Sequence, residues 1–148
     1  MKPANLAVPS LFILVLMISV GPFGDTLYTP SLPDIATSLQ VAYSDVQLTM
    51  TAYLCGYAVS QLLYGPFSDR FGRRPLMLIG ALAFVIGSFI CMYSDTIWWL
   101  ISGRFVQGLG ACAGAVISSA AVRDAFPRSE QGKVFAKMNI AFAIAPGL

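Results

Sequence analysis

Long apolar runs alternate with short polar segments along the chain. A helix needs about 20 apolar residues to cross the hydrocarbon core of a bilayer. Five runs suit this role, and they predict membrane-spanning helices at residues 6–27, 46–66, 76–93, 98–122 and 134–148. The fifth run is short and stops without polar flanking residues, so we expect it to be truncated and the chain to be part of a longer protein.

The amino-acid composition supports this membrane interpretation. Hydrophobic residues make up 57% of the chain and charged residues only 11%, whereas soluble domains carry about 25% charged residues. Such a chain has too few charges to cover a water-facing surface. The predicted fold class is therefore an all-α integral membrane protein, a multi-span helical bundle with about five membrane helices visible. The net charge of +2 gives no reason to expect a nucleic-acid partner.

The composition also argues against several classes of function. Histidine is absent, which removes the usual metal ligand and the usual proton carrier near neutral pH. The three cysteines lie inside apolar runs without a C-x-x-C spacing, and we interpret them as packing residues. The sequence shows no Ser-His-Asp set, metal cluster or phosphate-binding loop. We therefore expect no enzymatic activity, no catalytic residue and no metal or other cofactor.

The polar segments between the predicted spans differ in charge. Two loops, residues 28–45 and 94–97, carry only acidic charges, whereas the other three polar segments are basic. The basic residues are Lys2; Arg70, Arg73 and Arg74; and Arg123, Arg128, Lys133 and Lys137. Because basic loops stay in the cytoplasm, the N-terminus is predicted to be cytoplasmic. Trp98 and Trp99 then fit an aromatic belt at the outer face.

Two ionisable residues lie inside predicted spans. Asp25 is near the outer end of the first span and Arg104 is near the start of the fourth, so both fall in the outer half of the membrane. An intramembrane charge costs at least ~2.5 kcal/mol and is expected to face a partner or a cavity. One interpretation is a structural Asp25–Arg104 ion pair, or an Asp25 side chain that reaches the interface. The other is an Asp25 carboxyl that binds and releases protons, with movement relative to Arg104 coupling protonation to conformation.

A stripe of polar and aromatic residues runs along the second predicted span. Tyr53, Tyr57, Gln61 and Tyr64 recur at helical spacing and share one face. They could line an amphipathic substrate cavity, or they could hydrogen-bond neighbouring helices. The spacing alone does not separate these two interpretations.

The fourth predicted span contains closely spaced small residues. The run Gly110-Ala-Cys-Ala-Gly114 predicts a face on which other helices pack closely, because small residues let two backbones approach in lipid. Gln107 lies one turn from Arg104 on the same face, where it could share the arginine's site or bond a neighbouring helix.

Four segments resemble motifs of one transporter family. GPFSDRFGRRP resembles the loop motif between the second and third helices of the major facilitator superfamily, and RFVQGLGACAG resembles its fourth-helix motif. DTLYTPSLPDIA looks like the first-helix motif of proton-driven drug antiporters. NIAFAIAPGL looks like the opening of the fifth-helix antiporter motif, which starts at Pro146 and Gly147. Together they are most similar to the bacterial Bcr/CflA drug-resistance subfamily.

This resemblance implies a protein of twelve helices in two six-helix halves, with the substrate bound between the halves. The chain, residues 1–148, would supply part of the N-terminal six-helix bundle, and the C-terminal half would lie outside it. Arg104 would be the buried arginine implicated in proton transfer, and Asp25 would be the acid of the first helix.

The resemblance also implies an inner gate at the loop motif. Gly65 would allow the second helix to approach a helix of the other half. Asp69 would interact with that helix and with Arg73 to lock the gate, and Gly72 would make the tight turn. The remaining basic residues of the motif are Arg70 and Arg74.

The sequence thus predicts the N-terminal part of a proton-coupled secondary transporter in a bacterial inner membrane. It would export drugs or other small amphipathic molecules by alternating access, with the lipid bilayer, protons, a small-molecule substrate and the C-terminal half of the same transporter as partners. Two alternatives remain open. One is a dedicated metabolite or siderophore exporter on the same scaffold, and the other is a truncated membrane adaptor that does not transport.

Overall fold

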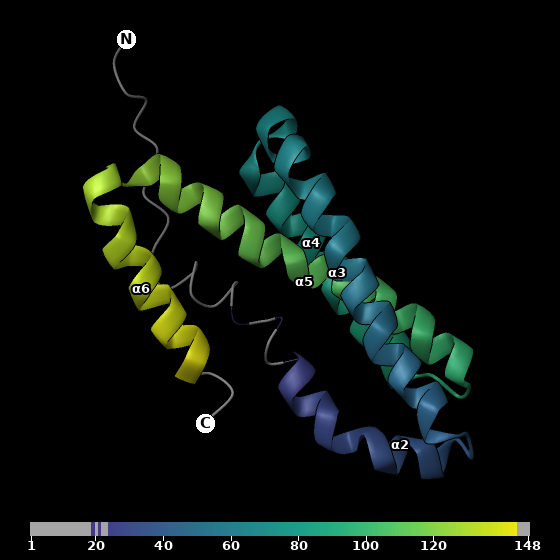
Figure 1. The fold of residues 1–148 in the computed structure, drawn as a ribbon. Coiled ribbons are helices and arrows are strands. Elements are labelled where there is room, and N and C mark those ends of the chain that lie inside the picture. Colours follow the sequence, from purple (N-terminus) through teal and green to yellow (C-terminus); the bar gives the residue numbers. More distant parts are fainter. Residues whose placement is uncertain (1–18, 20, 22–23, 145–148) are drawn as a thin grey trace.

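The computed structural model describes residues 19, 21 and 24–144, and this part of the chain is helical and contains no β-strand. Its elements in order are η1 (Thr29–Ser31), α2 (Leu32–Ser38), α3 (Tyr43–Phe71), α4 (Arg73–Met92), α5 (Ile97–Ala125) and α6 (Arg128–Ile144). Figure 1 shows α3 and α4 running alongside α5, with α6 folding back from the end of α5. The architecture agrees with the predicted all-α bundle.

The observed helices extend beyond most of the predicted spans. Helix α3 continues through Pro66, where the prediction ended, because a proline removes only one backbone donor and is tolerated in membrane helices. Helix α6 begins before the predicted span 134–148, whose last four residues lie outside the described part of the chain. Most of the first predicted span, 6–27, also lies outside the described residues.

Two of the described helices are long and apolar enough to cross a membrane. They are α4, over Arg73–Met92, and the part of α5 from Ile97 to Arg123. The connection between them is short, so they form an antiparallel pair.

Helix α5 is the centre of the bundle because small residues let both neighbours approach it closely. A Cβ on Gly108 would collide with the backbone carbonyl of Tyr53 on α3, and a Cβ on Gly110 would collide with the backbone of Phe84 on α4. Cys112, two residues beyond Gly110 on α5, is fully buried. The predicted packing face of small residues is confirmed, and it aligns α3 and α4 along the same helix.

The outer faces of these helices are apolar and exposed. The most exposed large side chains on α3 and α4 include Leu62, Leu78 and Leu82. Trp98 and Trp99 at the start of α5 are also exposed. Exposed apolar side chains are unfavourable in water, but lipid chains are equally apolar. These faces therefore suit contact with lipid.

The turn between α3 and α4 is made by one residue. Gly72 has a φ of 86° and its N–H donates a hydrogen bond to the carbonyl of Ser68 at 3.2 Å. Glycine adopts this positive φ without the steric cost that a Cβ would add. The turn therefore lets α4 begin immediately where α3 ends.

Candidate functional site

The site is built around Arg104, which lies two turns into α5 and is 2% exposed. Its Nη1 donates a hydrogen bond to Oε1 of Gln107 at 2.8 Å. Nε2 of Gln107 in turn donates to Oγ of Ser88 on α4 at 2.9 Å. The Ser88 hydroxyl donates to the carbonyl of Phe84 at 2.9 Å. This chain of polar groups ties the arginine to α4.

Two tyrosine rings hold the guanidinium group on its other sides. The guanidinium carbon of Arg104 lies 3.2 Å from the ring centre of Tyr28 and 5.4 Å from that of Tyr53. The Tyr28 hydroxyl shares a 2.6 Å hydrogen bond with Thr49 on α3, and the Tyr53 hydroxyl donates to the carbonyl of Gly21 at 3.2 Å. Both rings are thus fixed, and a desolvated cation–π contact contributes about 2 kcal/mol.

Asp25 lies near this cluster without joining it. The charges of Asp25 and Arg104 are within electrostatic range of each other, yet no ion pair connects them among the residues that the structure describes. Oδ1 of Asp25 is buried and has no hydrogen-bond partner there, while its backbone carbonyl accepts a bond from Thr29 at 2.8 Å. The predicted alternative of a structural ion pair is therefore not the arrangement observed.

Arg104 also has donors without partners. Its Nε and Nη2 are buried and make no hydrogen bond within the described part of the chain. An unsatisfied donor on a charged group is costly in a dry interior. The same region contains a pocket of about 240 Å³ between the segment before α2 and helices α4 and α5. It is lined by Gly24, Leu27, Tyr28, Ser31, Ser88, Cys91, Arg104 and Gln107.

The polar stripe predicted on the second span is only partly in the site. Tyr53 is buried against Arg104 and Tyr57 is half-buried, but Gln61 is exposed. Tyr64 packs beside a separate apolar cluster that contains Ile117. Tyr53 is therefore the member of the stripe whose ring contacts the arginine.

The predicted gate residues lie at the far end of α3. Gly72 is roughly 28 Å along the helix from Tyr53, at 1.5 Å per residue. Among the described residues, a Cβ on Gly65 would meet no atom within 4 Å. Arg70 and Arg74 are exposed and Arg73 is partly buried. The Asp69 side chain, together with Pro146 and Gly147, lies outside what the structure describes.

Tyr28 and Ser88 complete the site and were not selected from the sequence. Tyr28 follows Asp25 by three residues, which places both on neighbouring positions of a helical turn. That spacing is the signal that could have identified Tyr28. Ser88 gave no such signal, because serines are common in membrane helices and only the contact with Gln107 distinguishes it.

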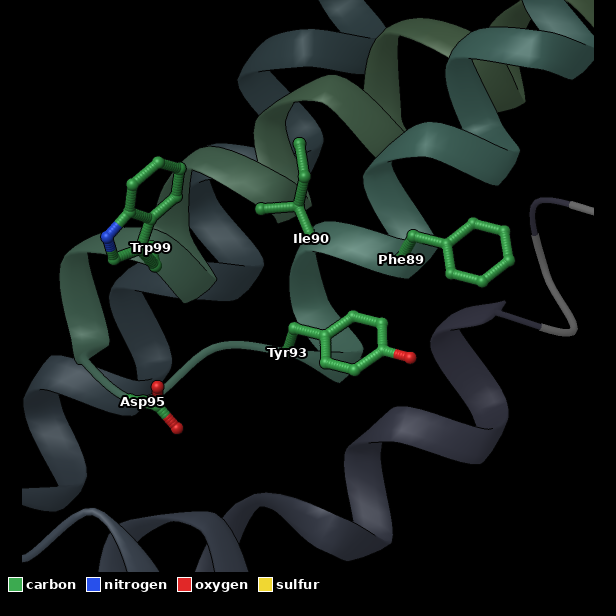
Figure 2. Close-up of a pocket in the computed structure, with 5 residues that line it drawn as sticks. All are labelled: Phe89, Ile90, Tyr93, Asp95 and Trp99. Carbon is green, nitrogen blue, oxygen red and sulfur yellow. The ribbon is translucent and has the colours of Figure 1, made fainter.

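A second and larger pocket lies where α4 turns into α5. It measures about 380 Å³ and is lined by Phe89, Ile90, Tyr93, Asp95 and Trp99. In Figure 2 Phe89 and Trp99 lie on opposite sides of Ile90 and Tyr93, so the rings do not close around one centre. Asp95 is the only carboxylate among these described lining residues. The buried polar cluster around Arg104 is therefore the stronger candidate for a functional site.

Comparison with known proteins places this geometry in a family context. A family model described as "Major Facilitator Superfamily" matches residues 14–148. The chain is 42% identical to an uncharacterized MFS-type transporter of Bacillus subtilis, over 91% of this chain and 34% of the relative. It is 36% identical to multidrug resistance protein D of Escherichia coli, over 92% and 34%. It is 35% identical to a bicyclomycin resistance protein homolog of Haemophilus influenzae, over 93% and 35%. The chain thus spans about a third of the length of these relatives.

Proposed function

The chain belongs to the Major Facilitator Superfamily, and from this premise we propose that it forms the first helices of a proton-coupled exporter. The family makes it a multi-pass membrane protein and a transporter rather than an enzyme. The proposed cargo is a drug or another small amphipathic molecule, moved by alternating access. Relatives named for multidrug and bicyclomycin resistance support this choice of cargo.

The observation that carries the proposal is the unpaired state of Asp25 and Arg104. Both are ionisable groups among apolar helices, and the described residues do not pair them. A charge inside a membrane is expensive, so such groups usually mark an ion or substrate pathway. A carboxyl that is protonated in one conformation and draws towards Arg104 in the other would couple proton movement to a conformational change. We propose this role for Asp25, with Arg104 as its electrostatic partner.

The test is transport in liposomes under an imposed pH gradient. The protein as its gene encodes it is reconstituted, and efflux of a fluorescent dye is compared with and without the gradient. We expect Asp25→Asn to remove the dependence on the gradient, because an amide does not titrate. Asp34→Asn is the matched control, since Asp34 is exposed on α2 and lies outside the pocket. Gradient-driven efflux at the wild-type rate in Asp25→Asn would overturn the proposal.

We further propose that the protein lies in the bacterial inner membrane with its N-terminus in the cytoplasm. The basic residues at the α3–α4 turn and around the start of α6, together with the exposed tryptophans at the start of α5, support this orientation. Alkaline phosphatase fused after Asp95 should be active because it is exported. The same enzyme fused after Arg128 should be inactive. The reverse pattern would contradict the orientation.

A further inference from the structure

We propose that the pocket beside Arg104 binds the carboxylate of the transported molecule, held side-on by Nε and Nη2 of the guanidinium group. The inference rests on the proposed function and adds a substrate class: amphipathic molecules that carry a carboxylate or a similar planar oxyanion. None of the named relatives is described by such a substrate.

The guanidinium group of Arg104 is engaged on its face and at one of its nitrogens. Its face is covered by the Tyr28 ring at 3.2 Å, and Nη1 is engaged by Gln107 at 2.8 Å. The remaining donors, Nε and Nη2, have no hydrogen-bond partner in the described part of the chain, and the Arg104 side chain lines the pocket. These two N–H groups share one edge of the planar guanidinium and point the same way. That edge is the fork which binds both oxygens of a carboxylate.

Among the residues that the structure describes, none supplies a hydrogen-bond acceptor for Nε and Nη2. Arginine keeps its proton at any physiological pH, so burial does not make the group neutral. The nearby Asp25 carboxyl does not reach it within the described structure, and its own Oδ1 is also without a partner. A buried cation with an empty fork is stabilised by an anion that arrives from outside.

The pocket next to Arg104 is small. At about 240 Å³ it is smaller than the roughly 300–1,000 Å³ of complete drug-sized sites. It therefore holds the acidic end of a larger molecule. Leu27 and Cys91 provide apolar lining next to the arginine. Ser31 and Ser88 also line the pocket, but their hydroxyl groups already donate to the backbone carbonyls of Leu27 and Phe84. This combination fits a carboxylate attached to a small apolar ring.

The test compares two probes of similar shape that differ in charge. Naphthoate and naphthamide are titrated into the purified protein, as its gene encodes it, in an uncharged detergent at neutral pH, with binding measured by calorimetry. We expect naphthoate to bind at least about tenfold more tightly, because hydrogen bonds to a charged partner are the stronger ones. Equal affinity for the two probes would overturn the inference.

Two variants assign the preference to Arg104. Arg104→Gln removes the fork, and Gln107→Glu keeps the arginine but adds a competing carboxylate beside it. We expect each folded variant to bind the two probes with affinities within about threefold of each other. Gln107→Glu decides the question if Arg104→Gln does not fold, as judged by size-exclusion chromatography. Arg123→Gln and Gln47→Glu are the matched controls, since both residues are exposed and outside the pocket. A tenfold preference retained in Gln107→Glu would overturn the inference.

Lipid phosphates offer the same oxyanion chemistry, so a second arm separates the two sources. Naphthoate binding is measured in nanodiscs of phosphatidylcholine, with and without phosphatidylglycerol. Unchanged naphthoate affinity supports a substrate carboxylate. Displacement of naphthoate by phosphatidylglycerol would mean that a lipid headgroup occupies the pocket, which overturns the inference. Because binding needs no gradient, a lost preference alongside intact proton-driven efflux would refute this inference alone. Lost proton-driven efflux with the preference intact would refute the proposed function alone.

Discussion

Replacing Gly87 with alanine is expected to force α4 away from α5 at the level of the functional site. A Cβ added to Gly87 would lie 2.5 Å from the backbone N of Gln107 and 2.8 Å from its Cα. It would also lie 2.8 Å from the carbonyl oxygen of Gly103. Because non-bonded heavy atoms prefer about 3.5–4.0 Å, the helices would have to separate by roughly 1 Å. All three atoms belong to the backbone, so no side chain can rotate out of the way.

The magnitude follows from two opposing effects. Forcing an extra carbon into a packed interface costs about 1–3 kcal/mol, while glycine to alanine in a helix gains about 1 kcal/mol of helix propensity. Gly132→Ala in α6 is the matched control, because a Cβ there meets no atom within 4 Å and the variant keeps only the gain. We therefore expect Gly87→Ala to be less stable than Gly132→Ala by about 1–3 kcal/mol.

The assay is unfolding by SDS in mixed micelles, followed by the loss of helical circular dichroism. The same preparation reports naphthoate binding, which should weaken because Gln107 positions Arg104. If the free energies of unfolding of the two variants agree within about 0.5 kcal/mol, the contact at Gly87 does not limit the approach of α4 and α5. The packing argument would then be refuted.

Four further substitutions test other contacts. Tyr28→Phe keeps the ring over Arg104 but loses the bond to Thr49, so we expect the free energy of unfolding to fall by about 0.5–1.5 kcal/mol. Tyr28→Leu removes the ring as well and should cost about 2 kcal/mol more; equal stability of the two in SDS titration would contradict the cation–π contact. Gly72→Ala places a Cβ at a φ of 86° and should lower the same free energy by about 1–2 kcal/mol, whereas no loss would show that the turn relaxes. Asp69→Asn should leave phosphatase-fusion topology intact while dye efflux fails, and normal efflux would reduce the loop to a topological anchor.

The polar stripe on α3 shows the limit of a prediction made from helical periodicity. Steps of four residues drift by about 40° each, because 3.6 residues complete a turn. Tyr57 is therefore displaced from the Tyr53 direction and only half-buried, and Gln61 is displaced twice as far and exposed. Tyr64 lies about 20° from Tyr53 and is again partly buried. The exposure of the four side chains thus follows their rotation around α3, and their role as cavity-lining residues stays a prediction.

The charged residues show a different limit. Arg104 and Gln107 lie one turn apart on the same helix, so local geometry predicted that they could share a site, and a hydrogen bond joins them. Asp25 and Arg104 lie on segments far apart in sequence, and their similar depth made an ion pair plausible. Depth along the membrane leaves the rotation of each helix undetermined. The rotation observed turns the guanidinium towards Tyr28 and leaves Oδ1 of Asp25 without a hydrogen-bond partner among the described residues.

The sequence by itself determined the class of the protein. A chain of apolar runs with so few charges forms helices in a membrane, because a lipid environment leaves the backbone no other way to satisfy its hydrogen bonds. It also located the two intramembrane charges and the small residues that pack α5. Only the tertiary structure decided which groups surround Arg104 and which of its donors remain free. Those contacts depend on how three helices rotate and cross, and that is set jointly by packing at Gly87, Gly108 and Gly110 rather than by any one segment.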